Sequence, residues 1–199
     1  MGFDELSPNG ICATAPVIET ARLRLRGLLV SDLDAQAAMN ADERVMRYAG
    51  GQPLGREDSW RRMISAPAMW VLFGFGGWIV ERKTDGAFLG QVFFADFKRD
   101  MAPSIEGQPE MGWMFAFHAH GQGYASEAVA AALDWADKNL AGQEIVAIID
   151  PDNAASIRVA EKAGFVRSGE GTYKENTILL YRREAGSPAA AAASSATTA

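Results

Sequence analysis

The chain has 199 residues, of which 48% are hydrophobic and 22% charged, and this composition suits one compact domain with loose ends. The net charge of −6, without a basic stripe, argues against a nucleic-acid binder, and no apolar run reaches the roughly 20 residues of a membrane helix. The single cysteine, Cys12, excludes an internal disulfide, and the first 20 residues carry no secretion signal, so we expect a cytoplasmic protein without membrane partners.

Composition changes at both ends of the chain. We expect residues 1–16 to form a loose N-terminal segment and residues 17–184 to form a single domain. Residues 185–199, rich in alanine, serine and threonine, have no large apolar side chain to bury and are predicted to be a disordered tail.

The first half of the domain predicts strands and two short helices. Residues 21–26 alternate apolar and basic side chains, as a half-buried strand does. A helix capped by Ser31 or Asp32 follows, and a second helix is predicted over residues 57–64, ending before Pro67.

A hairpin comes next, with strands at residues 77–82 and 88–94 joined by a turn. After a polar loop, the second half of the domain alternates strands and helices. Its strands are expected at residues 110–117, 144–149, 165–166 and 177–181, with one helix after the first and another, capped by Asp152 or Asn153, after the second. The pattern predicts an α/β domain with a mixed sheet.

The sharpest feature of the sequence is the glycine-rich segment from His118 to Ala125, between a predicted strand and a predicted helix. Its glycines let the backbone turn tightly and approach a ligand closely. The unpaired N–H groups and partial positive charge at the start of the helix can bind a phosphate. The segment has no lysine, so it is not a P-loop; an ordinary glycine-rich connection is the alternative.

The same segment nearly matches a dinucleotide-binding fingerprint, Gly121-x-Gly123-x-x-Ser126, with Asp150 at the end of the next strand. A nicotinamide-dependent enzyme is therefore an alternative. Two features oppose it, because hairpin strands precede the motif and only about 60 residues of the domain follow it, too few for a full doubly wound sheet.

A second cluster runs from Asp150 through Asn153 and Ser156 to Glu161-Lys162-Ala163-Gly164-Phe165. It resembles the GNAT acetyltransferase superfamily, and most closely its branch of ribosomal-protein N-terminal acetyltransferases, which reads Asn-x-x-Ser and then Glu-Lys-x-Gly-Phe. Residues 123–128 resemble the family's Gly-Tyr-Ala-x-Glu-Ala, and residues 21–26 resemble the opening strand of the branch. The resemblance covers about Val17 to Arg183, with three separated motifs in the right order.

The resemblance implies a mixed, mainly antiparallel central sheet with splayed middle strands, flanked by helices. It also implies acetyl-CoA as co-substrate, held between the strands of residues 110–117 and 144–150. The residues expected to bind it are Trp113, Met114 and Phe115 through their backbone, then His118, Gly121, Gln122, Gly123, Tyr124, Ala125 and Ser126 in the loop, and Asn153, Ser156, Arg158 and Lys162 on the following helix. Arg158 and Lys162 would approach the adenine or 3′-phosphate end, and solvated helix charges are the alternative for both.

The resemblance further implies transfer of the acetyl group to a primary amine by direct attack in a ternary complex. Such a transfer needs a neutral amine, stabilisation of the tetrahedral oxygen and neutralisation of the departing thiolate. Ser156 is the candidate acid, because Ala160 stands where many family members carry a tyrosine. Glu110 matches a position where the superfamily sometimes places its base. The alternatives are a serine bonded to the helix backbone and a strand-edge acid in water.

Several points stay open at this stage. The acceptor is an amine on a small molecule or a protein N-terminus. A non-catalytic acyl-CoA sensor is the alternative function, because of Ala160. His118 and His120 would share one face of a strand, but no third ligand accompanies them, so we predict no metal site. Exposed strand edges near the C-terminus could pair two chains into a homodimer.

Overall fold

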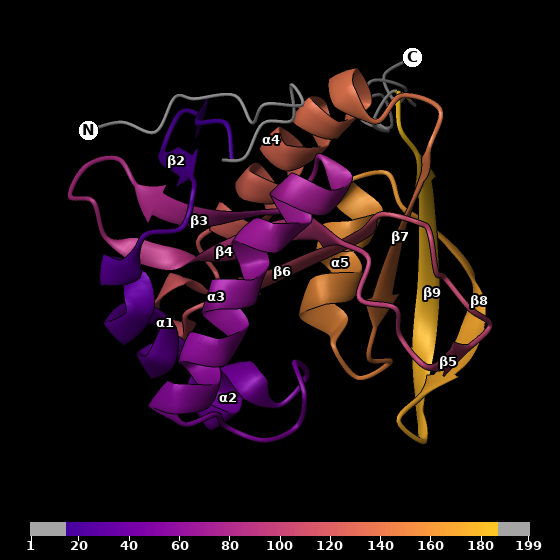
Figure 1. Cartoon of the computed structure of the whole chain (residues 1–199). Helices are drawn as coiled ribbons and strands as arrows, with labels where there is room; N and C mark the ends of the chain where they lie inside the picture. The colour runs from indigo at the N-terminus through magenta and orange to yellow at the C-terminus, as the bar shows by residue number, and fades with distance from the viewer. Residues whose placement is uncertain (1–14, 187–199) are drawn as a thin grey trace, which may run out of the picture.

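The computed structural model describes residues 15–186 and places them around one nine-stranded sheet, in the order β1-β2-β3-β4-β6-β7-β9-β8-β5 (Figure 1). The strands are β1 (Ile18–Glu19), β2 (Leu23–Arg26), β3 (Gly77–Arg82), β4 (Phe88–Ala95), β5 (Met101–Ala102), β6 (Glu110–Phe115), β7 (Glu144–Ile149), β8 (Val166–Tyr173) and β9 (Asn176–Glu184). The helices are α1 (Leu33–Asn40), α2 (Glu43–Met46), α3 (Arg56–Phe73), α4 (Tyr124–Asn139) and α5 (Ala154–Lys162), with 3-10 turns η1 (Val30–Asp32) and η2 (Phe117–Ala119).

The central strands β6 and β7 form the parallel pair of this sheet, and the pairs on either side of them are antiparallel. They meet at one point, where Glu110 lies opposite Val146 and the N–H of Val146 donates to the carbonyl of Pro109 (3.0 Å). Beyond this point the two strands diverge. The predicted mixed, mainly antiparallel sheet with splayed middle strands is therefore confirmed, and the parallel doubly wound sheet of a dinucleotide-binding domain is excluded.

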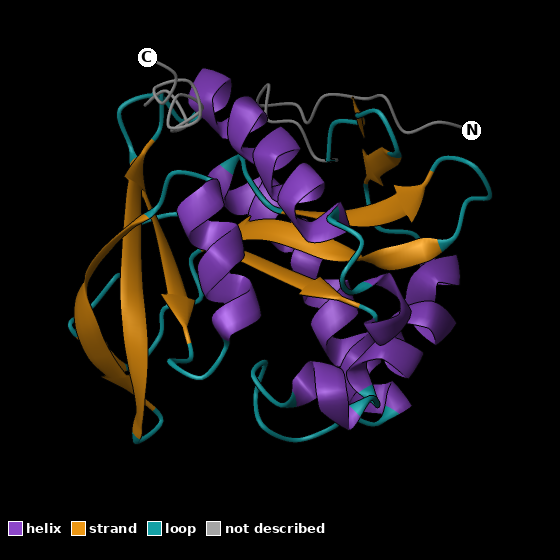
Figure 2. Cartoon of the chain, turned by 180° about the vertical axis from the view of Figure 1, so that it is seen from behind, coloured by secondary structure: helices purple, strands orange, loops and turns teal. Residues whose placement is uncertain are grey.

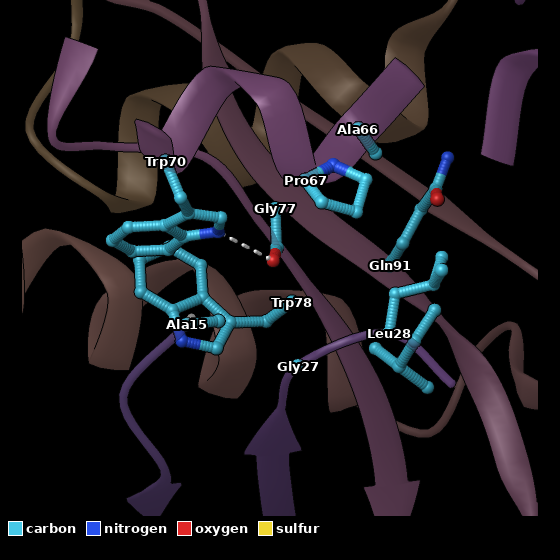
Figure 3. A pocket seen from close by; sticks show the side chains of 10 residues that line it. Ala15, Gly27, Leu28, Ala66, Pro67, Trp70, Gly77, Trp78 and Gln91 are labelled. Atoms are coloured by element: carbon cyan, nitrogen blue, oxygen red, sulfur yellow. Dashed lines mark hydrogen bonds between the residues drawn. The ribbon is translucent and has the colours of Figure 1, made fainter. Parts of the chain in front are cut away.

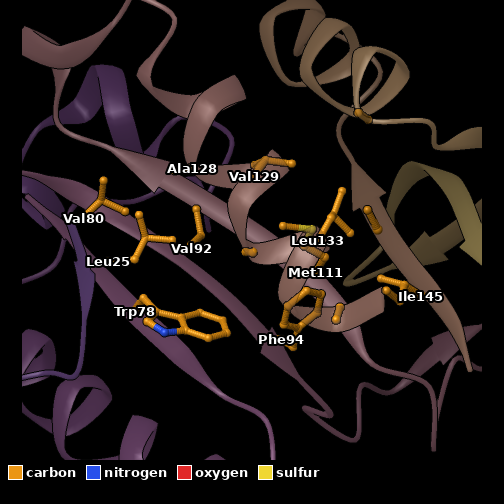
Figure 4. Close-up of a cluster of buried hydrophobic side chains, with 14 of the residues drawn as sticks. Leu25, Trp78, Val80, Val92, Phe94, Met111, Ala128, Val129, Leu133 and Ile145 are labelled. Atoms are coloured by element: carbon orange, nitrogen blue, oxygen red, sulfur yellow. The ribbon is translucent and has the colours of Figure 1, made fainter. Parts of the chain in front are cut away.

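Helices cover both faces of the sheet. Helices α1 and α2 lie on one side of the sheet, and α4 and α5 lie on the other (Figure 2). Helix α3 runs from α1 toward α4, where Trp70 packs against Trp135 (Figure 1). Helix α4 repeats small and apolar residues at three- and four-residue steps, and those on its sheet-facing side are buried: Ala128, Val129, Ala132, Leu133 and Ala136. They pack against side chains of β2, β3, β4 and β6 and build the main core (Figure 4).

Helix α3 differs from its prediction, because it continues through Pro67 to Phe73 instead of stopping near residue 64. Proline lacks an N–H and removes one hydrogen bond of the helix, so the segment beyond it needs another source of stability. Trp70 provides it: its ring packs edge-on against Trp78 (4.8 Å between centroids) and Trp135 (5.3 Å). Tertiary packing therefore overrides the local signal of the proline.

Smaller differences concern strand ends and the termini. Strand β6 ends at Phe115 and gives way to η2, the polar loop contains β5, and the last two predicted strands are parts of the longer hairpin β8–β9. Ala185, expected in the tail, is buried, and its N–H donates to the carbonyl of Gln143 (3.0 Å). The rest of the predicted tail from residue 187 and the N-terminal segment up to residue 14 lie outside the described residues. Within residues 15–186, no helix has the length and apolar character needed to cross a membrane.

Candidate active site

Two helices begin where the two diverging parallel strands end. Helix α4 follows β6 through η2 and the glycine loop, and α5 follows β7 through residues 150–153. Because β6 and β7 run in the same direction, both helix N-termini lie at the same end of the sheet and flank the divergence (Figure 2). The two predicted motifs, more than 20 residues apart in the sequence, are thus brought to one place.

The backbone of β6 alternates between its two neighbours. The N–H of Ala116 donates to the carbonyl of Leu89 (2.8 Å), and Met114 lies opposite Gln91, so the backbone groups of Met114 also face β4. This register corrects the expectation for Met114, whose N–H and C=O belong to the β4–β6 ladder. Its side chain packs instead against α1, in a small cluster with Met39.

The residues on either side of Met114 have the opposite orientation. The N–H and C=O groups of Trp113 and Phe115 point away from β4, toward the side on which β7 diverges. The carbonyl of Phe115 accepts a hydrogen bond from Nε2 of His120 (2.9 Å). Both groups of Trp113 and the N–H of Phe115 are therefore available to pair with an extended ligand.

The glycine loop exposes backbone N–H groups. Gly121 (φ 75°) and Gly123 (φ 77°) adopt left-handed conformations, which side chains other than glycine rarely tolerate. The side chain of Gln122 folds back and donates from Nε2 to the carbonyl of His118 (2.7 Å). The N–H of Glu127 is the first in α4 to bond back along the chain, to the carbonyl of Gly123 (3.1 Å). The N–H groups of residues 124–126 therefore have no acceptor in the helix and remain for a ligand.

The residues of the glycine loop differ in their exposure to solvent. His118, Gly121, Gln122 and Gly123 are exposed, whereas the side chain of Tyr124 is buried in the main core. His118 lies in η2 and not on a strand, so it does not share a strand face with His120. Within residues 15–186 there is no cluster of three metal-ligating side chains.

Asn153 caps α5 and leaves one polar group for a ligand. Its Oδ1 accepts a hydrogen bond from the N–H of Ser156 (3.1 Å), which satisfies one of the unpaired donors of the helix. Its Nδ2 has no acceptor among residues 15–186 and can donate to a ligand. The hydroxyl of Ser156, half-buried in the first turn, has no hydrogen-bond partner among the described residues, so the expected alternative of a bond to the helix backbone does not occur.

The rest of α5 separates into a buried and an exposed side. Ala160, in the position where a tyrosine acid was considered, is fully buried in the main core. Arg158 and Lys162, four residues apart, are both exposed on the other side of the helix. A side chain at position 160 therefore faces the core, and the helix presents cations only at its outer surface.

Glu110 is not the water-exposed strand-edge acid considered as an alternative. It is 4% exposed, and both of its oxygens accept hydrogen bonds from Arg99, Nε to Oε2 at 2.6 Å and Nη2 to Oε1 at 2.8 Å. The guanidinium of Arg99 lies between the rings of Phe97 and Tyr173, 4.8 Å from each centroid. Burial would lower the pKa of Arg99, but the hydrogen bonds and charge of Glu110 raise it above its ordinary value.

Three side chains that the sequence analysis did not assign hold the loop from behind: Thr20, Arg22 and Glu127. The carboxylate of Glu127 accepts a hydrogen bond from the hydroxyl of Thr20 (2.6 Å) and two from Arg22. Burial would raise the pKa of Glu127, but these hydrogen bonds outweigh it and lower the pKa below the ordinary value of glutamate. The sequence shows the basic residues of the alternating strand and the glutamate after the loop. It does not show that these residues lie close together in the fold.

A small cavity of about 90 Å³ lies away from the loop, between α3 and β3 (Figure 3). Trp70 and Trp78 form part of its wall, and the indole N–H of Trp70 donates to the carbonyl of Gly77 (3.1 Å). Its volume is far below the roughly 300 Å³ of a small ligand site, so it does not accommodate an acyl-CoA arm.

Comparisons with known proteins agree on one family. Residues 22–166 match the family model described as an acetyltransferase (GNAT) domain. In Bacillus subtilis, the uncharacterized protein YkkB is 40% identical over 56% of this chain and 63% of its own length, so the match spans less than two thirds of that relative. The uncharacterized N-acetyltransferase YnaD of the same species is 40% identical over 76% of this chain and 84% of its own length.

Solved structures share the fold. An acetyltransferase from Agrobacterium tumefaciens is 28% identical, with a TM-score of 0.73 over 86% of this chain and 95% of its own. A spermidine N-acetyltransferase from Vibrio cholerae, solved with CoA and spermine, is 18% identical, with a TM-score of 0.65 over 83% and 97%. The ribosomal L7/L12 acetyltransferase RimL is 16% identical, with a TM-score of 0.68 over 85% and 94%. At these last two identities the likeness concerns the fold alone.

Proposed function

Because the chain belongs to the GNAT acetyltransferase family, we propose that it is an acetyl-CoA-dependent N-acetyltransferase that acylates a primary amine. One observation carries the proposal: β6 and β7 diverge beside two helix N-termini, which leaves strand and loop N–H groups directed toward the same space. That arrangement fits a ligand with an extended amide-containing arm and a pyrophosphate.

The residues present fit acetyl-CoA group by group. Trp113 and the N–H of Phe115 would pair with the pantetheine arm as a neighbouring strand does, and Nδ2 of Asn153 would donate to one of its carbonyls. The backbone amides of Gly121 to Ser126 would bind the pyrophosphate, with His118 at the edge of the loop. Arg158 and Lys162 would approach the adenine or 3′-phosphate end from the exposed side of α5.

Acetyl-CoA supplies the thioester that the amine attacks, and the protein groups act on charges and protons. The N–H of Trp113 would stabilise the tetrahedral oxygen, which leaves the C=O of Trp113 and the N–H of Phe115 for the pantetheine arm. Ser156, whose hydroxyl has no protein partner among the described residues, would donate a proton to the leaving thiolate. Glu110 is proposed as the base, with Arg99 holding both of its oxygens while each oxygen keeps a further lone pair for an amine proton.

The surroundings of Glu110 bear on the acceptor. Asp96 accepts a hydrogen bond from Nζ of Lys98 (2.7 Å) and another from the N–H of Gly107 (3.0 Å), and Glu106 pairs with the same lysine. Asp96, between β4 and β5, and Glu106, between β5 and β6, thus have cationic or backbone partners, so these two acids do not form a strongly anionic site for a polyamine. The solved Vibrio cholerae relative, named for spermidine, provides the comparison substrate.

The test is a calorimetric titration of the full chain with acetyl-CoA, with NADH as the comparison ligand, followed by CoA release over a panel of amines that includes spermidine and N-terminal peptides. Binding of acetyl-CoA but not NADH, with release of CoA for at least one amine, supports the proposal. Binding without release over the panel favours the acyl-CoA sensor. A chain that binds no acetyl-CoA overturns both.

A matched pair of variants tests the loop itself. Gly123→Trp should abolish acetyl-CoA binding, because the side chain would fill the loop and strain a φ of 77°. Gly86→Trp is the control, since Gly86 has a similar φ (70°) in an open turn between β3 and β4. Equal effects of the two variants would show that the loop has no special part in binding.

A further inference from the structure

The glycine loop is attached to the connection between β1 and β2, and 100 residues separate the partners of this contact. Arg22 donates from Nη1 to the carbonyl of Gln122 (3.0 Å) and from Nε to Oε2 of Glu127 (2.7 Å). Its guanidinium lies over the ring of Tyr124, 4.6 Å from the centroid. One side chain therefore contacts the loop, the first turn of α4 and the buried residue that anchors this turn.

Both oxygens of the Glu127 carboxylate take part in the same contact. It accepts the hydroxyl of Thr20 (2.6 Å) and the backbone N–H of Arg22 (2.9 Å) on Oε1, and Nε of Arg22 on Oε2. Its side chain is 19% exposed. Three donors from one short segment fix this carboxylate, and charge-assisted hydrogen bonds of this kind are stronger than neutral ones.

The location of Glu127 needs an explanation. A carboxylate in the first turn of α4 repels a second anion at the same helix N-terminus, so on electrostatic grounds it opposes phosphate binding. The loop also contains two glycines, the residue type with the most backbone freedom to lose when it becomes ordered. A loop of this composition binds more tightly when other contacts have already fixed its conformation.

We propose that Arg22 is a positioning residue for the pyrophosphate loop and that Glu127 is its anchor. Arg22 holds the carbonyl of Gln122 on the rear side of the loop, which keeps the N–H groups of the loop directed to the phosphates. The inference rests on the proposed function, because it concerns how the same loop binds CoA.

The experiment measures the affinity of the full chain for CoA and for pantetheine, which lacks the pyrophosphate, by calorimetry. Arg22→Ala should weaken CoA binding by about tenfold, the scale of a lost hydrogen bond to a charged group, and leave pantetheine binding unchanged. Arg24→Ala is the matched control. Arg24 lies two residues further along the same alternating segment, and its side chain is similarly exposed (51%, against 48% for Arg22). It pairs with Glu19 and not with the loop. It should leave both affinities unchanged.

Glu127→Gln gives a test of opposite sign. If charge alone mattered, removing a carboxylate near the phosphates would tighten CoA binding. The proposal expects the reverse. A glutamine has one acceptor oxygen where glutamate has two, so it cannot accept both from Nε of Arg22 and from the donors on the other oxygen, and the anchor is weakened. Arg22→Lys should not restore affinity, since a lysine cannot hold two acceptors in the fork geometry of arginine.

Three results would overturn the proposal. They are unchanged CoA affinity in Arg22→Ala, tighter CoA binding in Glu127→Gln, and full rescue by Arg22→Lys, which would identify Arg22 as a direct phosphate contact. Thermal unfolding of each variant checks that the fold is kept. Failure of the wild-type chain to bind CoA would instead remove the proposed function, so the two failures are distinguishable.

Discussion

The hydroxyl of Ser156 has no hydrogen-bond partner among the described residues, which leaves it free to act as the proposed acid. We expect Ser156→Ala to lower kcat for amine acetylation by about 100-fold, the typical contribution of a general acid, with little change in the affinity for acetyl-CoA. Its backbone N–H, which bonds to Asn153, is kept in alanine, so the cap of α5 should survive. Steady-state kinetics and calorimetry on the same preparation check this. A kcat equal to that of the wild type would exclude Ser156 as the acid.

Variants of Glu110 and Arg99 separate two roles of the Glu110 carboxylate, that of the catalytic base and that of an anchor for Arg99. If Glu110 is the base, Glu110→Gln should lower kcat by about 100-fold and remove a pH-dependent limb of the rate profile. If Glu110 only anchors Arg99, then Arg99→Ala should cause an equal loss and both variants should keep the wild-type pH profile. Measuring kcat against pH for the two variants decides between these roles. Arg167→Ala, which breaks the exposed pair with Glu170, serves as the control for loss of a guanidinium.

Residue types and spacing in the sequence predicted the glycine loop and a cap of α5 by Asp152 or Asn153, and the family resemblance identified Ser156 as a candidate. They did not predict the partners of Glu110, because Arg99 lies in an irregular loop with no periodicity. They also did not predict the orientation of Met114, since a backbone direction depends on strand register. Motifs thus identify which residues could contribute to the site, whereas strand register and loop packing decide which way their backbone and side-chain groups point.

At the scale of elements, α3 was predicted to end before Pro67 but continues through it, and a substitution at Pro67 tests what this costs the helix. Because the helix continues on both sides of this residue, Pro67→Ala should restore a backbone hydrogen bond and remove a steric clash. We expect the variant to raise the free energy of unfolding by about 1 to 3 kcal/mol, less any packing lost where Pro67 lines the small cavity. Urea denaturation measures it. A destabilised variant would mean that the proline stabilises the turn preceding Trp70.

Periodicity located most elements, and it failed where tertiary contacts dominate. The strands at residues 77–82 and 144–149 have the predicted bounds. The second half of α3 was missed because Trp70 packs on Trp78 and Trp135 from distant segments, and no local pattern contains that information. Likewise α1 buries the polar residues Gln36 and Asn40, which a hydrophobic pattern cannot reveal.

At the scale of the whole molecule, the mainly antiparallel sheet with splayed middle strands followed from the family resemblance and not from periodicity. Composition and patterning alone predicted a mixed sheet, but the single contact point between β6 and β7 depends on long-range pairing. The same holds for ion pairs that join distant elements. One of them, between Asp137 of α4 and Arg183 of β9, connects the helix behind the loop to the strand next to β7.

The ion pair between Asp137 and Arg183 should stabilise the fold at neutral pH and lose this effect in acid. Both oxygens of Asp137 accept from Arg183 (2.7 and 2.8 Å), and the N–H of Gly186 adds a third bond (2.7 Å). The hydrogen bonds from Arg183 lower the pKa of Asp137 below its ordinary value and outweigh the effect of burial. Because the folded-state pKa is the lower one, the stabilisation is complete above the ordinary aspartate pKa of about 3.9 and is lost as the pH falls through the folded value.

We therefore expect Asp137→Asn to lower the free energy of unfolding by about 3 kcal/mol at pH 7, because it leaves the buried Arg183 without its carboxylate. The difference from the wild type should begin to shrink as the pH falls below about 4, where Asp137 of the unfolded wild-type chain becomes protonated, and should vanish below the lower pKa of the folded state. Asp134→Asn, an exposed acid on the same helix, should change stability little at any pH. Urea denaturation between pH 3 and pH 7 measures all three proteins. A difference between Asp137→Asn and the wild type that stays constant over this range would show that the pair stabilises the fold through packing and not through charge.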